Sequence, residues 1–151
     1  ISITVTSTGE LREEISDLRT ESTPQQGVPI AQIIVNNNDI DGFGINIQSD
    51  RGGKLMLFRN NNFPTSVMAG NHINYTVDLV RGTQGVLGAS LPHVSERTSI
   101  NLATPYEVLF DDNVVESTTN AELKLMIHTN AKKDLFHGLF RDIFIISIRD
   151  L

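Results

Sequence analysis

The chain has 151 residues, of which 39% are hydrophobic and 20% charged, and its net charge at pH 7 is −6. This acidic balance argues against nucleic acid or an anionic membrane surface as a partner, because both are bound through basic patches. No apolar run approaches the roughly 18 residues of a membrane span. Cysteine is absent, which excludes disulfides and thiol chemistry. We expect one domain, and the start at Ile1 without a signal peptide is typical of a mature exported chain.

The first segment, Ile1–Thr6, alternates β-branched apolar residues with hydroxyl residues. Strand side chains point alternately to opposite faces, so this hexamer predicts a strand with Ile1, Ile3 and Val5 on one face.

The second segment, Glu10–Arg19, favours a helix. Leu11, Ile15 and Leu18 recur at the helical period, with charged residues between them. A short strand around Ile15–Leu18 is the alternative.

The middle of the chain predicts a series of short strands, and we expect those between residues 28 and 59 to form a meander. Residues 81–93 contain three glycines and a proline, which indicates an exposed connection. The expected strands are Val28–Val35, Phe43–Gln48, Lys54–Arg59, Ile73–Val80, Ser99–Leu102, Tyr106–Phe110 and Ala121–Thr129.

The last predicted strand, Leu139–Ile148, is the most apolar. Every residue from Ile143 to Ile146 is apolar, which favours a strand buried on both faces inside a sandwich. We expect no further strand to pair with its outer edge, and such an edge invites another strand to add itself. Ile1–Thr6 is the candidate.

These strands together predict an all-β fold, an immunoglobulin-like β-sandwich in which helix is minor. Residues 37–42 match the first half of a calcium loop, but Gln48 stands where the bidentate Glu belongs, which favours a plain turn. The four histidines have no ligand spacing, and no Gly-x-Ser-x-Gly elbow is present. We therefore expect no metal, no cofactor and no enzyme activity.

Three stretches together resemble a chaperone–usher-type bacterial pilin. They are the hexamer Ile1–Thr6, the stretch Gly42–Leu55 with G-F-G-I-N-I-Q-S followed by G-G-K-L, and the closing stretch His137–Ile148, H-G-L-F-R-D-I-F-I-I-S-I. Many pilins have a disulfide near the start, and this chain has none, so the resemblance is to cysteine-free, alpha-type or related fimbrial subunits.

The resemblance implies an incomplete sandwich at residues 10–151, preceded by a donor strand extension at residues 1–9. Ile1, Ile3 and Val5 would insert into another copy. The implied product is a homopolymer, an extracellular filament on the cell surface that supports adhesion or biofilm formation. A periplasmic chaperone and an outer-membrane usher are the implied partners. The implied acceptor groove involves Phe140, Ile143, Phe144, Ile145, Ile146 and Ile148.

The residues themselves leave an alternative open. If Ile1–Thr6 paired within its own domain, it would fill the same groove. The chain would then be a self-complete β-sandwich binding module, such as an adhesin or carbohydrate-binding domain, with the loop at residues 81–93 as a candidate ligand site.

Overall fold

The computed structural model describes residues 2–7, 13–37, 41–81, 97–111 and 119–151. All regular structure in these ranges is β-strand, which confirms the all-β class, and they contain no helix that could span a membrane. The strands are β1 (Ser2–Ser7), β2 (Glu13–Ile15), β3 (Gln25–Asn37), β4 (Gly42–Ser49), β5 (Lys54–Phe58), β6 (His72–Arg81), β7 (Arg97–Ile100), β8 (Tyr106–Asp111), β9 (Thr119–Thr129), β10 (Gly138–Arg141) and β11 (Phe144–Asp150).

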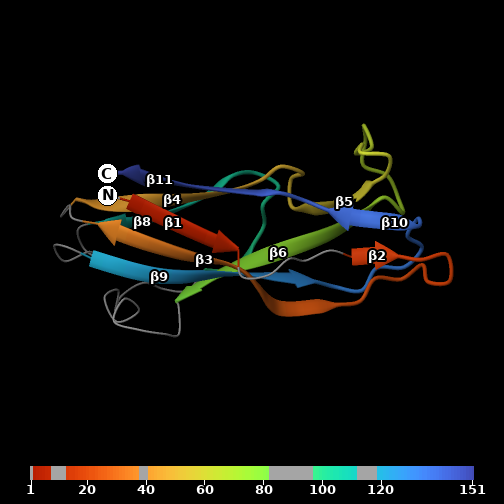
Figure 1. Cartoon of the computed structure of the whole chain (residues 1–151), viewed down its shortest axis with the longest axis horizontal. Helices are drawn as coiled ribbons and strands as arrows, with labels where there is room; N and C mark the ends of the chain where they lie inside the picture. The colour runs from red at the N-terminus through yellow and green to blue at the C-terminus, as the bar shows by residue number, and fades with distance from the viewer. Residues whose placement is uncertain (1, 8–12, 38–40, 82–96, 112–118) are drawn as a thin grey trace.

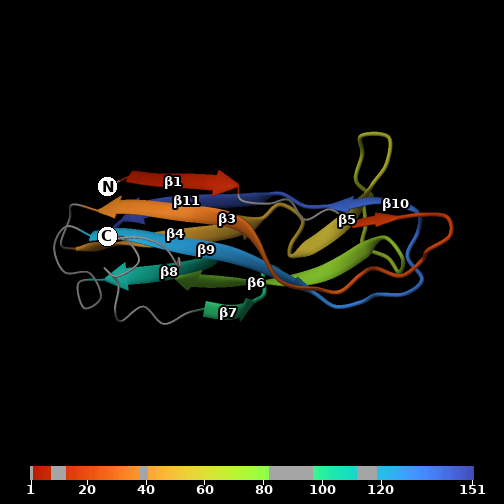
Figure 2. The ribbon, with the colours of Figure 1, turned by 60° about the horizontal axis from the view of Figure 1, so that its bottom comes forward.

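The strands form two antiparallel sheets in an elongated molecule (Figure 1). The larger sheet has the order β1-β3-β9-β6-β5-β10-β2, with β7 also paired to β6, and the smaller has the order β11-β4-β8. In both views the smaller sheet lies beside β1, β3 and β9, whereas β2, β5 and β10 lie at the opposite end (Figure 2).

The core is built from the alternating residues that face inward from both sheets. In β4, Phe43 and Ile45 are fully buried, and in the larger sheet so are Ile33 and Leu125. The ring of Phe43 packs against that of Phe110, with centroids 4.8 Å apart. Burial alternates along β6, where Ile73, Tyr75, Val77 and Leu79 are buried and the residues between them are not.

The predicted helix over Glu10–Arg19 is wrong for the residues that the structure describes there. Residues 13–15 form β2, and a turn follows in which the Arg19 N–H donates to the Ser16 carbonyl at 3.0 Å. Ile15 is 2% exposed but Leu18 is 100% exposed, so the two do not share a buried helix face. The short-strand alternative is closer, although the strand begins earlier and ends at Ile15.

The predicted meander over residues 28–59 is also wrong. β3 pairs with β1 and β9, β4 with β11 and β8, and β5 with β10 and β6. Consecutive strands here never pair with each other, because the chain passes from the larger sheet to the smaller one and back.

The predicted strand Leu139–Ile148 is in fact two strands in different sheets, β10 and β11, separated by Asp142 and Ile143. Its expected burial on both faces is wrong, since Ile143 is 52% exposed and Ile145 49% exposed. The apolar run from Ile143 to Ile146 therefore belongs to an edge strand whose outer face is exposed to solvent. As expected, no strand in the described ranges pairs with the outer edge of β11.

Candidate functional site

β1 and β11 are edge strands of different sheets, and they lie side by side along one flank of the molecule (Figures 1 and 2). β1 pairs with β3 from Ser2, opposite Asn36, to Ser7, opposite Ala31. β11 pairs with β4. β1 and β11 approach each other without forming a ladder. We call the line along which these two strand edges lie next to each other the seam.

On the β1 side of the seam, core-facing side chains are only partly covered. Ile3 and Val5 lie opposite Val35 and Ile33, which are both fully buried. Cross-strand partners share a face, so Ile3 and Val5 also face the core. Ile3 is nevertheless only partly buried and Val5 is 43% exposed. Ile1 lies outside the described residues.

The β11 side of the seam is covered no better. Phe144, Ile146 and Ile148 pack against the core but are only partly buried. The Phe144 ring lies edge-on to that of Tyr75, with centroids 5.5 Å apart. Both strands thus present apolar side chains that the single chain does not fully cover.

The remaining predicted acceptor residues do not line the seam. Phe140 is fully buried in β10, at the opposite end of the molecule from β1. Ile143 and Ile145 are exposed, and Ile145 lies on the face of β11 that points away from the core. Of the predicted acceptor groove, the structure therefore places Phe144, Ile146 and Ile148 along the seam.

Asp142 fixes the point at which the chain leaves β10 and enters β11. Its carboxylate accepts hydrogen bonds from the Ser49 hydroxyl, from the Tyr75 hydroxyl at 2.5 Å and from the Arg51 N–H at 2.9 Å. Burial raises the pKa of the Tyr75 hydroxyl, and the hydrogen bond to Asp142 raises this pKa further, so the phenol remains a donor. We call this hydrogen-bonded link between β10 and β11 the Asp142 corner. It holds the start of β11 in a fixed position.

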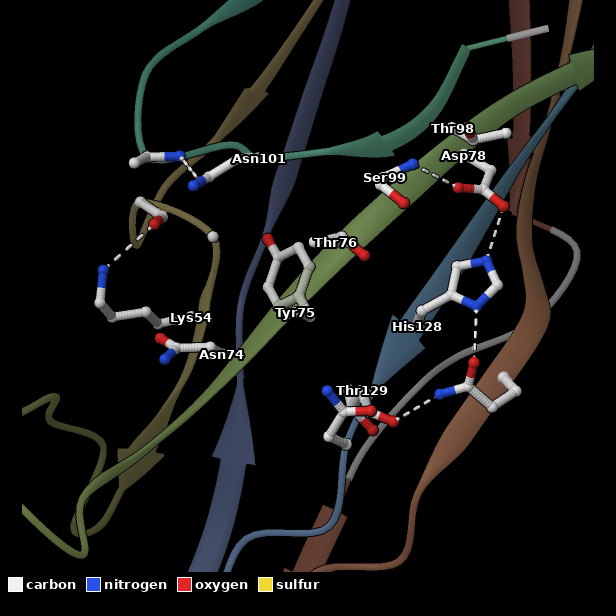
Figure 3. Close-up of a pocket in the computed structure, with 15 residues that line it drawn as sticks. Lys54, Asn74, Tyr75, Thr76, Asp78, Thr98, Ser99, Asn101, His128 and Thr129 are labelled. Carbon is white, nitrogen blue, oxygen red and sulfur yellow. Dashed lines mark hydrogen bonds and ion pairs between the residues drawn. The ribbon is translucent and has the colours of Figure 1, made fainter.

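A second feature is a polar groove of about 720 Å³ on the outer face of the larger sheet (Figure 3). Alternation along β6 sends Tyr75 and Val77 into the core and Asn74, Thr76 and Asp78 toward the groove. The rest of the lining comes from the turn before β5, from β7 and the residues just after it, from the start of β3 and from the end of β9. We call this the polar groove.

His128 of β9 links the strands beneath the polar groove. Its Nδ1 lies 3.1 Å from the Gly27 N–H, and its Nε2 lies 2.7 Å from Asp78 Oδ2. Gln26 Oε1 also lies 3.2 Å from Nδ1. A backbone N–H can only donate, so we assign the lone pair to Nδ1 and the proton to Nε2, which donates to Asp78.

This arrangement does not favour general-base chemistry. Both ring nitrogens of His128 are engaged, one by a main-chain donor and the other by Asp78. A histidine that activates a nucleophile needs one nitrogen free to take its proton. The pair therefore serves to hold β3, β9 and β6 together.

Two other predicted features lie outside the described residues. They are most of the loop at residues 81–93, and Asn38, Asp39 and Ile40 of the calcium-like turn. Among the residues that are described, no group of three acidic, histidine or cysteine side chains could hold a metal ion.

Sequence reasoning missed the polar groove. A signal was present, since Asn74, Thr76 and Asp78 alternate with apolar residues along a strand, but such residues usually mark a solvated face. The hollow forms because the β5 turn and the β7 region flank β6, which no local pattern shows. Comparisons with protein-family models, with curated proteins and with solved structures found no match to this chain.

Proposed function

We propose that the chain is a structural subunit of an extracellular cell-surface filament, of the pilus kind that its sequence resembles, in which copies are joined by exchange of β1. In this proposal β1 of one copy pairs with β3 of the next and lies beside its β11. The observation that supports it is the seam, where two neighbouring strand edges carry core-facing apolar side chains that are incompletely covered. The fold would then be an immunoglobulin-like sandwich completed by a donated strand.

Exchange is physically feasible because it preserves contacts. The β1–β3 register is the same whether β1 comes from the same copy or from another. Swapping an identical element between copies therefore costs little, and a head-to-tail swap that does not close on itself gives a fibre. Fully burying a side chain such as Ile3 or Val5 is worth about 1.5–3 kcal/mol. An assembly that closes the seam more completely than the single chain does gains part of that energy.

The resemblance also supplies the partners in this proposal. A periplasmic chaperone would cover the seam by adding a strand of its own, and an outer-membrane usher would bring successive copies together. Strand addition suits the seam because the edges of β1 and β11 offer main-chain groups for pairing and an added strand would cover the half-buried apolar side chains.

The test uses an engineered disulfide that reports which copy holds β1. Thr4 lies opposite Ile34 on the outward face of the β1–β3 ladder, and facing residues of an antiparallel pair lie within disulfide reach. The double variant Thr4→Cys/Ile34→Cys is refolded at high concentration, oxidised and run on a non-reducing gel. Because the chain has no other cysteine, every bridge joins two of the introduced thiols, and the control variant shows how many multimers arise from chance contacts between copies.

Exchange predicts a ladder of covalently linked multimers. If β1 pairs only with β3 of its own chain, the gel shows only bridged monomers, and the proposal is overturned. The matched control is Gln32→Cys/Lys124→Cys, which bridges β3 and β9. These strands are not exchanged in the proposal, so the control should give bridged monomers in either case.

The second candidate function is a self-complete binding module, such as an adhesin or carbohydrate-binding domain. The pairing of β1 with β3 of the same chain favours it. This candidate predicts a folded, long-lived monomer in size-exclusion chromatography after refolding, with all bridges of the Thr4/Ile34 variant inside one chain.

A further inference from the structure

The polar groove has the size and the lining of a small-molecule site. Its volume of about 720 Å³ lies within the range of about 300–1,000 Å³ that is common for ligand pockets. Figure 3 shows short hydroxyl and amide side chains arranged around the space, contributed by β6, by the β7 region and by β9.

Several of these groups have no partner among the residues that the structure describes. Among the described residues, the side chains of Asn74 and Thr76 and the hydroxyl of Ser99 make no hydrogen bond. Asn101 uses its Oδ1 to accept from the Ala103 N–H at 2.9 Å, which leaves its amide NH2 available. The groove therefore offers both donors and acceptors to a ligand.

Ser99 is held in an unusual conformation that turns its hydroxyl toward this space. Its φ is 54°, in the left-handed region that non-glycine residues rarely adopt, and the β6–β7 ladder shifts register beside it. The Ser99 N–H donates to Asp78 Oδ1 at 2.8 Å, and Asp78 is in turn held by His128. Ser99 and Thr76 both line the polar groove (Figure 3). Such strain, with a bulge that re-aims a side chain, is typical of binding sites.

The lining selects a class of ligand. An apolar molecule would strip water from these polar groups without replacing their hydrogen bonds. A nucleic acid base would find no large stacking platform, because Tyr75 is 4% exposed and the other ring of the lining is the small imidazole of His128, which is 27% exposed. A polyanion is disfavoured by the charges of the lining. Lys54 supplies one positive charge, and the carboxylate of Asp78 would repel an anion. A neutral, hydroxyl-rich molecule can both donate to and accept from the free amides and hydroxyls.

We propose that the polar groove binds a neutral saccharide, one or two sugar units long, through Asn74, Thr76, Ser99 and Asn101. This inference does not depend on exchange of β1. Without an aromatic ring to stack on a sugar face, the affinity is modest, with a Kd on the order of 1 mM for a ligand of this size.

The experiment is an NMR titration of the isotope-labelled protein with neutral mono- and disaccharides and, as a charged comparison, with uronic acids. At least one neutral sugar should shift the side-chain amide signals of Asn74 and Asn101. Thr76→Val removes one hydroxyl at constant shape and should weaken binding about fivefold to tenfold. Thr4→Val, the same change on an exposed face of β1, should leave binding unchanged.

Ser99→Gly separates binding from folding. Glycine accepts the φ of Ser99, so this variant should be at least as stable as the parent while its affinity for the sugar falls several-fold. The proposal is overturned if no neutral sugar binds below about 10 mM, if only uronic acids bind, or if both groove variants bind as well as the parent.

Discussion

At the scale of single residues, the hydrogen-bond partners of Asp142 could not be predicted from the sequence. Asp142 lies in the closing stretch His137–Ile148, and nothing local in that stretch indicates what its carboxylate binds. Its side-chain partners Ser49 and Tyr75 lie 93 and 67 residues away in the chain. A further bond comes from the Ile143 N–H at 2.7 Å. An ionised carboxylate has about four acceptor sites, and these four donors satisfy them.

His72 provides a pH prediction. Burial lowers the pKa of its imidazole below 6.5, and the positive charge of Lys132 lowers this pKa further. Lys132 Nζ lies 3.1 Å from His72 Nε2 and also donates to the His72 carbonyl at 2.8 Å, so Nε2 accepts and the ring is neutral. Below about pH 6.5 the unfolded chain binds a proton that the folded chain does not. The free energy of unfolding should therefore decrease as the pH falls through 6.5 and level off below the folded-state pKa.

The measurement is urea denaturation of the parent and of His72→Gln between pH 5 and 8, a window chosen to span the ordinary histidine value of about 6.5. The difference in unfolding free energy between the two should shrink toward acidic pH. The prediction fails if the two profiles are parallel. His137→Gln is the comparison variant, since it replaces an exposed histidine that contacts Asp17 but not Lys132.

At the scale of elements, the sequence predicts strands better than it predicts their neighbours. β4, β6 and β9 carry apolar residues at alternate positions, and this local signal places them within a few residues. Pairing depends on which faces meet across the molecule, and for that reason the meander failed. β2 was missed because three residues are too short for a period to show, while Ile15 and Leu18 happen to fall at helical spacing.

Gly138 at the start of β10 tests how tightly the elements are packed. Its φ is 140°, and a Cβ there would lie 2.7 Å from Leu57 Cδ1. Gly138→Ala combines backbone strain with this overlap and should lower the free energy of unfolding by about 2–4 kcal/mol. Gly52→Ala is the matched control, because its φ is 64° and the nearest atoms are 3.9 Å away. It should cost only about 1 kcal/mol. Equal losses in urea denaturation would contradict the role given to Leu57.

At the scale of the whole molecule, the sequence supplied the two segments that border the seam but not their geometry. It predicted a first strand with one apolar face and a last strand with an unpaired edge. It could not show that the predicted strand Leu139–Ile148 passes from one sheet to the other at Asp142 and Ile143, because neither Gly nor Pro marks that point. For the same reason Phe140 was assigned to a groove that lies at the other end of the molecule.

A peptide tests whether the seam accepts a strand from outside. A chain lacking residues 1–7 should be less stable than the parent and remain monomeric, because Ile33 and Val35 lose their cross-strand partners. A synthetic peptide of residues 1–7 should bind it and restore the melting temperature. The same peptide with Ile3→Asp should fail, since that side chain faces the core, whereas Thr4→Asp, on the exposed face, should bind. The proposal would be refuted by two peptide variants that bind equally well.

The way β1 is attached has a consequence for the speed of assembly. A strand held by one ladder, with half-covered side chains, detaches reversibly far more often than the whole domain unfolds. Each such local opening bares the β3 edge while the Asp142 corner keeps β11 in place. Copies could therefore exchange β1 under native conditions. The rate would depend on how often β1 detaches and not on how often the whole domain unfolds.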